Sequence, residues 1–307
     1  MAERAAARRP LGRLYEHRVQ ARTLRLYRLA VSRYLEWAHS VGLPSATDDD
    51  DLDSHCMHFL EHCWATGGDR TSAGHVLSGI SFALRRRRIL TGSWGLFRTW
   101  GRLELPRRAP PMPQAVLLAM AGVAFSWQVQ DVSLLLILAF SGFLRTMEAL
   151  TLHRWQVVPD KRGGRLLLHL PFTKSGARRG VVENVVISDS TVVAAVERLL
   201  PLLPEQQPLL CRSKHEYRRV FKALLEACGV ADHGFQPYSL RRGGATTHLA
   251  THGNLAMTVE MGRWADARTG RVYLTSGLQI LHELSMSDEL GRRHAELASP
   301  LLTFLAA

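Results

Sequence analysis

A proline-rich segment about a third of the way along the chain places the strongest limit on how it can fold. Between Pro106 and Pro113 the sequence reads PRRAPPMP, with four prolines in eight residues. Proline lacks a backbone N–H and clashes with the preceding helical turn, so a helix cannot continue through this run. Such a segment forms a stiff, extended connector instead. With 307 residues, the chain is long enough for two domains with hydrophobic cores. We therefore predict that residues 106–113 are a linker between two domains.

The charge of the chain indicates its partner. The formal net charge is +12 and the pI is about 10.3, which favours a polyanionic partner, with nucleic acid as the first candidate. Of the 39 basic residues, 35 are arginine. Arginine enrichment also accompanies GC-rich coding DNA, so charge alone does not decide the matter. Of the four cysteines, only Cys56 and Cys63 lie close in sequence, which predicts reduced thiols rather than a disulfide framework.

The apolar segments predict a protein without a membrane partner. The longest apolar run, Val132 to Phe140, is too short to cross a bilayer and reads as a buried helix. The N-terminus carries several arginines but lacks the apolar core of a signal peptide. We expect a soluble intracellular protein that acts at DNA, in the nucleus if the source is eukaryotic and in the cytoplasm if it is bacterial.

The N-terminal part is predicted to be a flexible arm followed by helices. Residues 1–18 are basic and rich in alanine, and we predict a flexible basic arm there. Residues 19–105 show helical periodicity with breaks at glycines and a proline. A third helix is predicted from about Thr71 into a run of four arginines. That run is either a solvated helix end or a stripe that contacts phosphates; it consists of Arg85, Arg86, Arg87 and Arg88.

The C-terminal part is predicted to be mainly helical with a small antiparallel sheet. Residues rich in β-branched and apolar side chains between turn signals predict short strands at 155–158, 165–170 and 181–187. Helices are predicted near 114–125, 131–140, 190–200, 213–228, 239–252, 255–261 and 269–281. Residues 286–307 form a tail with one more amphipathic stretch. The predicted class is therefore mainly α, with an α+β C-terminal domain.

Two arginines stand in segments that suit phosphate binding. A phosphodiester gains negative charge on its nonbridging oxygens during displacement, and fixed donors aimed at those oxygens stabilise that charge. Arginine fits because its planar fork stays charged and can bind two oxygens. Arg145 lies in GFLRTMEALTL, with Glu148 three residues later, and Arg241 lies in YSLRRGG, followed by Arg242. The alternative for the first pair is an ordinary ion pair between residues three apart on a helix.

Three further residues complete a set that suits phosphoryl transfer. Trp264 follows Arg241 by 23 residues, within MGRW, and Tyr273 follows nine residues later. Lys174 lies in PFTKSGARRG between two predicted strands. A tyrosine can attack a phosphate, and a lysine can protonate the leaving oxygen. The alternatives are a buried structural tryptophan and a solvated turn lysine, although Lys174 is one of only four lysines in the chain.

These segments resemble the catalytic domain of the tyrosine recombinases, the phage-integrase-like enzymes that cut and rejoin DNA. Arg145 and Arg241 match the two arginine boxes of the family, and Glu148 its acidic residue. The resemblance implies that Lys174 is the general acid of the β-hairpin. It implies that Trp264 contacts the phosphate and that Tyr273 is the nucleophile, forming a 3′-phosphotyrosyl link and releasing a 5′ hydroxyl. Neither ATP, a metal nor another cofactor is implied.

Tyr238 departs from the family pattern, because histidine or lysine usually stands at its position. A phenol can donate a hydrogen bond to phosphate, but with a pKa of about 10 it is a poor base at neutral pH. We expect weaker activity rather than none. His233 and His248 do not have the matching position.

The resemblance also implies an architecture and partners. Residues 114–285 resemble the catalytic domain, and residues 19–105 resemble the SAM-like helical core-binding domain in length and pattern. Together they imply a two-domain, C-shaped clamp around double-stranded DNA, used for DNA integration or the movement of mobile elements. Arg107, Arg108 and Arg242, with the arginine run in the third helix, are the predicted DNA contacts. Family members act as homo-tetramers on paired sites. Residues in the C-terminal tail either dock into a neighbouring copy or pack on their own domain.

Three alternatives stay open. A type IB topoisomerase shares the tyrosine chemistry but relaxes DNA without exchanging strands. A catalytically weakened, DNA-binding descendant of an integrase would fit the change at Tyr238. His58 and His62 are four apart and could form a metal pair, but Cys56 points to another face of the helix, which favours an ordinary amphipathic helix.

Overall fold

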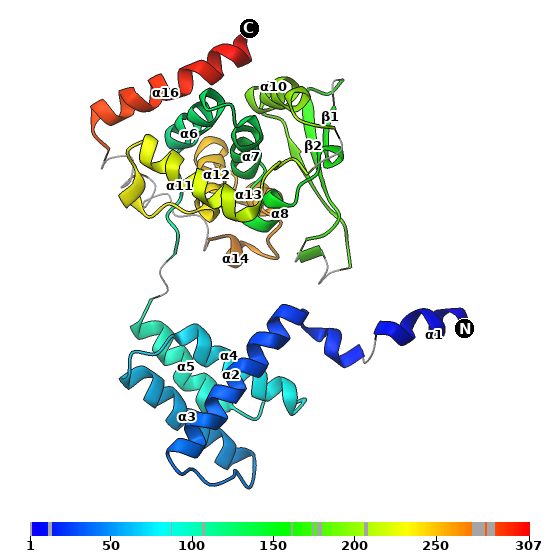
Figure 1. Ribbon diagram of the computed structural model, residues 1–307, viewed down its shortest axis with the longest axis vertical. Coiled ribbons are helices and arrows are strands. Elements are labelled where there is room, and N and C mark those ends of the chain that lie inside the picture. Colours follow the sequence, from blue (N-terminus) through cyan, green and yellow to red (C-terminus); the bar gives the residue numbers. More distant parts are fainter. Residues whose placement is uncertain are drawn as a thin grey trace. The chain divides into compact units, whose positions relative to one another are not determined.

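The computed structural model describes residues 2–11, 14–86, 88–105, 108–160, 162–173, 175–176, 180–205, 208–271, 280 and 286–307. The chain forms two compact units, Met1–Arg107 and Arg108–Ala307 (Figure 1). Most of the described residues are helical, and three strands among them form one antiparallel sheet. The predicted class, mainly α with a small sheet in the second of two domains, is confirmed. Across the described segments, no helix combines the length and the apolar character needed to span a membrane.

The N-terminal unit is built around a bundle of helices. Three short helical turns, α1 (Ala2–Arg8), η1 (Arg9–Leu11) and η2 (Leu14–Arg18), come before it. The bundle contains α2 (Ala21–Ser40), α3 (Asp49–Ala65), α4 (Arg70–Ala83) and α5 (Thr91–Leu103). The segment predicted as a flexible arm is therefore largely helical. The Tyr15 hydroxyl donates a hydrogen bond to the backbone oxygen of Phe82 (2.7 Å), which ties the end of this segment to α4.

Local hydrogen bonds explain where the helices of the first unit begin. Asp48 caps α3, because its carboxylate accepts the backbone N–H groups of Asp50 and Asp51 at 3.0 and 2.8 Å. The carboxylate of Asp53, within α3, accepts the N–H groups of Gly92 and Ser93 at 2.7 and 2.8 Å. One acidic side chain thus fixes the first turn of α5 against α3.

The third helix ends earlier than predicted. α4 stops at Ala83, and Arg85 adopts a left-handed backbone conformation with φ of 58°. Consecutive arginines repel one another, and left-handed residues interrupt a helix. The prediction that the helix runs through the arginine stretch is wrong for the described residues.

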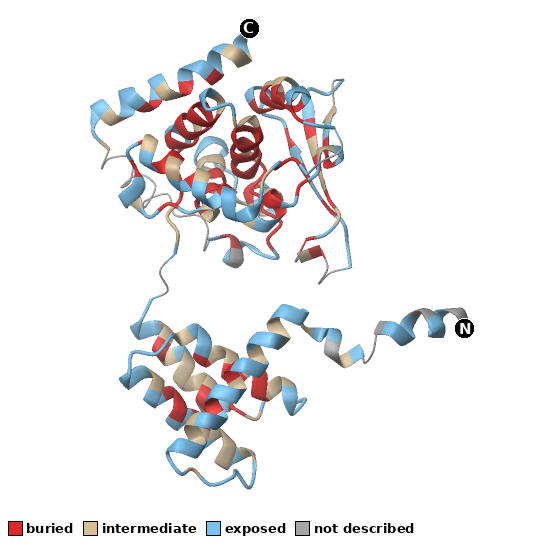
Figure 2. Ribbon diagram, in the orientation of Figure 1, coloured by how far each residue is buried: buried red, intermediate tan, exposed pale blue. Residues whose placement is uncertain are grey.

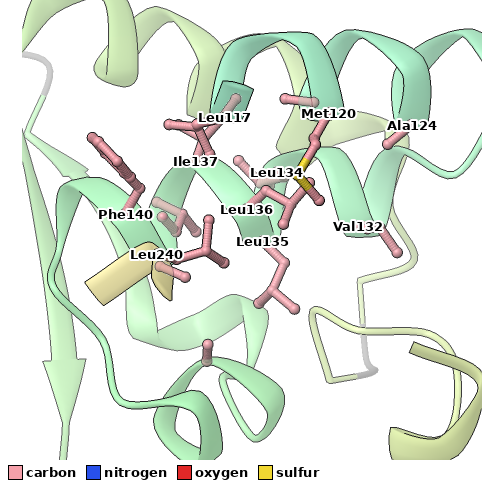
Figure 3. Close-up of a cluster of buried hydrophobic side chains, with 14 of the residues drawn as sticks. Leu117, Met120, Ala124, Val132, Leu134, Leu135, Leu136, Ile137, Phe140 and Leu240 are labelled. Atoms are coloured by element: carbon pink, nitrogen blue, oxygen red, sulfur yellow. The ribbon is translucent and has the colours of Figure 1, made fainter. Parts of the chain in front are cut away.

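The core of the C-terminal unit is a pair of buried helices. α6 (Gln114–Ser126) packs on α7 (Gln130–Ser141), and α7 is buried over nearly its whole length (Figure 2). In the cluster that also contains Leu240, Leu117 of α6 lies beside Ile137 of α7, and Met120 of α6 lies beside Leu134 (Figure 3). The uninterrupted apolar run from Val132 to Phe140 therefore forms a buried helix, as predicted.

The remaining elements surround this pair. They are α8 (Thr146–Leu150), η3 (Arg154–Gln156), α10 (Ser190–Leu199), η4 (Leu200–Leu202), α11 (Lys214–Ala227), η5 (Ala231–His233), α12 (Pro237–His252), α13 (Leu255–Met261), α14 (Ala267–Arg271) and α16 (Asp288–Ala306). The short helix α8 was not predicted. Most of the predicted helix at 269–281 lies outside the described residues.

The sheet consists of β1 (Val157–Asp160), β2 (Arg165–Leu170) and β3 (Glu183–Ile187) in the order β1-β2-β3. The predicted first strand starts two residues late, because Trp155 belongs to η3. In β3, burial alternates, and Glu183 shares the buried face with Val185 and Ile187. The register pairs Glu183 with Leu170. The alternation of the strand therefore directs a carboxylate into the interior.

Two glycines let α12 approach its neighbours closely. A Cβ added at Gly244 would overlap the carbonyl oxygen of Phe140, and one at Gly243 would overlap that of Met112. No larger residue fits at either position without moving a backbone. The GG that follows the two arginines in the sequence thus seats α12 against the end of α7, and Arg241 and Arg242 become buried.

The tail forms helix α16, which lies along α6 (Figure 1). Gly122 permits this contact, since a Cβ there would overlap the carbonyl oxygen of Leu297. Leu301 is fully buried, and the ring Nε2 of His294 lies 2.9 Å from the carbonyl oxygen of Cys228. In this structure of a single copy the tail packs on its own domain, and docking into a neighbouring copy stays a prediction.

Candidate active site

The first arginine box lies in the turn between α7 and α8. Phe143, in this turn, has a left-handed backbone with φ of 45°. Arg145 directly precedes α8, and its backbone N–H donates to Glu148 Oε2 at 2.9 Å. Its guanidinium Nη1 lies 2.5 Å from Glu148 Oε1. The pair is not an ordinary surface pair, because the Glu148 side chain is only 6% exposed and that of Arg145 is 26% exposed.

The second arginine box is buried beneath this turn. Arg241 is 1% exposed. Its Nη1 donates to the carbonyl oxygen of Phe143, and its Nη2 donates to that of Gly262 at 2.7 Å. Burial lowers the pKa of Arg241 to about 10, with further lowering by neighbouring Arg263 and Arg145. The guanidinium therefore stays protonated at neutral pH, where it joins the first box to the segment before Trp264.

Trp264 packs beside the second arginine. Its ring centroid lies 5.1 Å from the Arg241 guanidinium carbon, a cation–π distance. The side chain is buried and belongs to a small cluster with Phe143 and Ala245. A Cβ at Gly262 would overlap the Trp264 ring, so glycine is required two residues earlier. Trp264 is thus a buried tryptophan, as the alternative of a structural role predicted, and its ring also lies against Arg241.

Arg263 is a site residue that sequence reasoning missed. Its side chain is 5% exposed, and its backbone is left-handed with φ of 54°. Its Nη2 lies 3.0 Å from the Phe143 carbonyl oxygen and 2.9 Å from Glu148 Oε2. Burial lowers the pKa of Arg263. In the sequence, the position of Arg263 between Gly262 and Trp264 could have indicated a site residue. In an arginine-rich chain, however, one more arginine gives little reason to predict a buried one.

Glu183 is the second residue that was missed. Its Oε2 lies 3.9 Å from Arg145 Nη1 and 4.0 Å from Arg263 Nη1. It also accepts hydrogen bonds from the hydroxyls of Thr173 (2.7 Å) and Ser175 (2.9 Å). In the sequence, Glu183 could have been recognised because it precedes Val185 and Ile187 at a spacing of two, which places it on the apolar face of the predicted strand. We refer to Arg145, Glu148, Glu183, Arg241 and Arg263 as the arginine–glutamate cluster.

Lys174 and Tyr273, the predicted acid and nucleophile, lie outside the described residues. Both described neighbours of Lys174 bind Glu183 through their hydroxyls, so the hairpin that carries Lys174 is attached to the cluster on either side of it. The described residues that precede Tyr273 end at Arg271, the last residue of α14. A Cβ at Gly270 would lie 3.3 Å from the Trp264 ring, so the segment before Tyr273 packs against Trp264.

The other predicted residues fall in three environments. Tyr238 is half-buried in the first turn of α12, and its electrostatic influence on Arg241 raises that arginine's pKa slightly against the larger effect of burial. Arg242 is 3% exposed, so a direct DNA contact would require this side chain to move. The imidazole Nδ1 of His248 lies 2.8 Å from the Thr258 hydroxyl, and its ring packs edge-on against Phe143. His233 stacks on Phe235, in η5 and the loop after it.

The predicted DNA-contacting arginines of the first unit lie at its surface. Arg85, Arg86 and Arg88 are exposed, and so is Arg108 at the start of the second unit. Arg86 Nη1 lies 2.6 Å from Asp49 Oδ2, and the Arg85 guanidinium covers the Tyr15 ring at 4.9 Å. Arg87 and Arg107 lie outside the described residues.

The fold is similar to that of known recombinases, although the sequence matches neither a family model nor a curated protein. The structure matches XerH site-specific recombinase, bound to a palindromic difH substrate in a post-cleavage complex, with a TM-score of 0.61. That match covers 85% of this chain and 78% of XerH at 14% identity. The chain has the fold of a tyrosine recombinase.

A second recombinase-type structure covers nearly all of both chains. The Tn1549 transposon integrase, in complex with a circular-intermediate DNA, matches with a TM-score of 0.55 at 12% identity. The match spans 95% of this chain and 97% of the integrase fragment, residues 82–397, in that structure. The tyrosine recombinase fold therefore extends over both units of this protein, and the arginine–glutamate cluster lies in the second.

Proposed function

We propose that this protein is a site-specific DNA recombinase that cuts and rejoins duplex DNA through a covalent link to Tyr273. One observation carries the proposal. Arg241 donates to the carbonyl oxygen of Phe143, two residues before Arg145, and its guanidinium lies against the Trp264 ring, so three segments far apart in the chain meet within a tyrosine recombinase fold. The similar XerH and Tn1549 integrase structures are complexes with DNA, which supports double-stranded DNA as the partner here.

The arginines would act on the scissile phosphate as fixed charges. Arg145 is the most exposed member of the cluster, and we assign it the first contact with a nonbridging oxygen. An oriented donor of this kind contributes roughly 3–4 kcal/mol to transition-state stabilisation, by analogy with oxyanion-hole donors. Arg241 donates to two carbonyl oxygens and keeps further N–H groups, but it is 1% exposed, so a contact with phosphate requires the site to open when DNA binds.

Tyr273, Lys174 and Tyr238 would divide the covalent chemistry. The Tyr273 hydroxyl gives its proton to solvent as its oxygen bonds to phosphorus, the bond from phosphorus to the 5′ oxygen breaks, and protonated Lys174 gives a proton to that leaving oxygen. The attack of another strand's 5′ hydroxyl on the phosphotyrosine reverses these changes and seals the exchanged strand. Tyr238 would donate a hydrogen bond to the phosphate. In this scheme four copies assemble on two paired sites.

Covalent capture on DNA tests the proposal. The full-length protein is incubated with a pool of random-sequence duplexes carrying a nick, and denaturation-resistant adducts are counted. The nick lets the short cleaved strand diffuse away, so rejoining cannot hide the adduct. We expect adducts with the wild type and none with Tyr273→Phe, whose DNA affinity stays within about threefold because phosphate contacts dominate binding.

Three other outcomes would contradict the proposal. Tight binding by the wild type without any adduct would identify a DNA-binding descendant of an integrase. Adducts accompanied by relaxation of supercoiled DNA, but never by joining of two duplexes, would identify a topoisomerase. Adducts that persist in Tyr273→Phe would move the nucleophile to another residue.

A further inference from the structure

Arg263 contacts both carboxylates of the cluster and shares a partner with each of its two other arginines. Its Nη2 reaches the Phe143 carbonyl, which also accepts Arg241, and Glu148, which also binds Arg145. Its Nη1 lies 4.0 Å from Glu183, the carboxylate that holds the hydroxyls on either side of Lys174. One buried guanidinium thus shares a partner with each of the two matched arginines and with the hairpin.

The charges of the cluster leave one positive charge in excess. The cluster, as defined, contains three guanidinium groups and two carboxylates. Glu148 and Glu183 are nearly inaccessible, at 6% and 3% side-chain exposure, so solvent screens their attraction for Arg145 only weakly. Without Arg263, two arginines would face two carboxylates and the excess would vanish. Glu148 and Glu183 would then hold Arg145 more strongly, and an incoming phosphate would have to compete with them.

We propose that Arg263 is a positioning residue that neutralises Glu148 and Glu183, so that Arg145 can bind a phosphodiester. The single positive charge in excess balances the single negative charge of one phosphodiester group. Arg263 acts through the two carboxylates and the Phe143 carbonyl, without touching the DNA itself. The inference rests on the proposed function and deepens it, since it concerns how the same site accepts its substrate.

The left-handed backbone of Arg263 supports this assignment. A non-glycine residue with φ of 54° carries conformational strain, which persists only where surrounding contacts overdetermine it. The contacts of its side chain supply that determination, and they fix the Gly262 carbonyl that Arg241 binds. Because Trp264 follows directly, one short segment sets the positions of Arg241, Arg263 and Trp264 together.

The test asks whether removal of one carboxylate corrects the loss of phosphate binding caused by removal of Arg263. We compare wild type, Arg263→Gln, Arg263→Lys and the double variant Arg263→Gln with Glu183→Gln. The double variant restores the excess positive charge without restoring the guanidinium. Arg212→Gln is the matched control, because Arg212 makes two 2.9 Å bonds to buried Asp131 elsewhere in the same unit. Should the double variant not fold, Glu148→Gln replaces Glu183→Gln in it.

The probe is inorganic phosphate, which requires neither a known DNA site nor catalysis. The rise in melting temperature is measured as phosphate replaces chloride at constant ionic strength, since a ligand that binds only the folded state raises stability with its concentration. We expect Arg263→Gln to weaken phosphate binding about tenfold or more, whereas Arg263→Lys and the double variant stay within about threefold of wild type. Arg212→Gln should melt earlier but keep the full phosphate-induced rise.

The outcomes separate this inference from the proposed function. Loss of phosphate binding in Arg263→Gln with recovery in the double variant supports the inference, even if no variant ever forms a DNA adduct, in which case only the proposed function fails. Equal phosphate binding in wild type and Arg263→Gln overturns the inference. So does a double variant that remains as defective as Arg263→Gln, because Arg263 would then serve packing alone. If adducts do form, their rate in single-turnover capture should follow the same order.

Discussion

The two units of this protein place arginine in opposite environments. In the first unit, Arg86 and its partner Asp49 are 62% and 46% exposed, and an ion pair of this kind contributes only about 0–1 kcal/mol. In the second unit, Arg241 is 1% exposed and its donors are bound to backbone carbonyls. Leaving a buried acceptor of this kind without its donor costs about 1–3 kcal/mol. Burial, rather than residue type, thus separates an adjustable surface charge from a fixed one.

Lys174 sharpens this comparison, because a lysine can give up its proton whereas the cluster arginines stay charged. If Lys174 protonates the leaving 5′ oxygen, Lys174→Ala should slow cleavage by about 10²–10⁴-fold. A substrate with sulfur at that bridging position has a better leaving group and needs no proton. The variant should therefore cleave the sulfur substrate at nearly the wild-type rate, as measured by single-turnover adduct formation. Arg145→Ala is the control and should be defective on both substrates. Equal defects of Lys174→Ala on both would limit the lysine to positioning DNA.

Replacing one arginine in each unit with alanine tests whether burial sets the role of these arginines. We expect Arg241→Ala to slow cleavage by about 10²–10³-fold and to lower the free energy of unfolding by about 1–3 kcal/mol, because buried carbonyl oxygens lose their donor. Arg86→Ala should change the free energy of unfolding by less than about 0.5 kcal/mol and leave the cleavage rate at saturating DNA unchanged. Urea denaturation and single-turnover capture measure the two quantities. Similar stabilities for the two variants would mean that burial does not set the role of these arginines.

The sequence predicted the architecture better than the cluster. Apolar runs and the proline segment predicted the helices and the sheet, because apolar pattern and backbone preference are local properties of the sequence. Arg145, Glu148, Arg241 and Trp264 were predicted because they stand in recognisable boxes, and the structure brings them together. Arg263 was missed because nothing in an arginine-rich sequence shows which arginines become buried. Its role depends on tertiary contacts with Glu148 and with Phe143.

Glu183 shows the same limit from the other side. Its strand was predicted, but a glutamate at the start of a strand reads as a surface residue. Its burial follows from the register, which aligns it with Val185 and Ile187 on the inner face. The end of α4 was also mispredicted, because the left-handed turn at Arg85 has no glycine to announce it. Alternation and register matter most where a charged residue occupies an apolar position.

Salt should separate the two groups of arginines in a single experiment. If the exposed arginines contact DNA phosphates, affinity should fall with salt on a log–log slope of about −5 or steeper, and Arg88→Ala should reduce the slope by about one. The cleavage rate at saturating DNA depends on buried charges, which salt screens little. We therefore expect that rate to change by less than about twofold over the same range of salt. Filter binding and single-turnover capture provide the measurements, and a flat binding curve would contradict a duplex clamp.

The smallest expected effect concerns pH. Burial lowers the pKa of His248 below its ordinary value of 6.5, and nearby His252 lowers it further. Between the folded pKa and 6.5 the unfolded chain binds more protons, so stability present above pH 6.5 is lost as the pH falls. The melting temperature of His248→Gln should therefore decline less on acidification than that of wild type. His39→Gln, at an exposed position of the first unit, should follow the wild-type profile. Identical profiles for wild type and His248→Gln would contradict the assignment.

The identity of the covalent bond tests the account most directly. Adducts captured on nicked random-sequence duplexes are digested, and mass spectrometry locates the modified residue and the attached DNA end. The account predicts one modified peptide, with the DNA joined to Tyr273 through a 3′ phosphate and with a 5′ hydroxyl on the released strand. A link to any other residue, or a link through a 5′ phosphate, would contradict it.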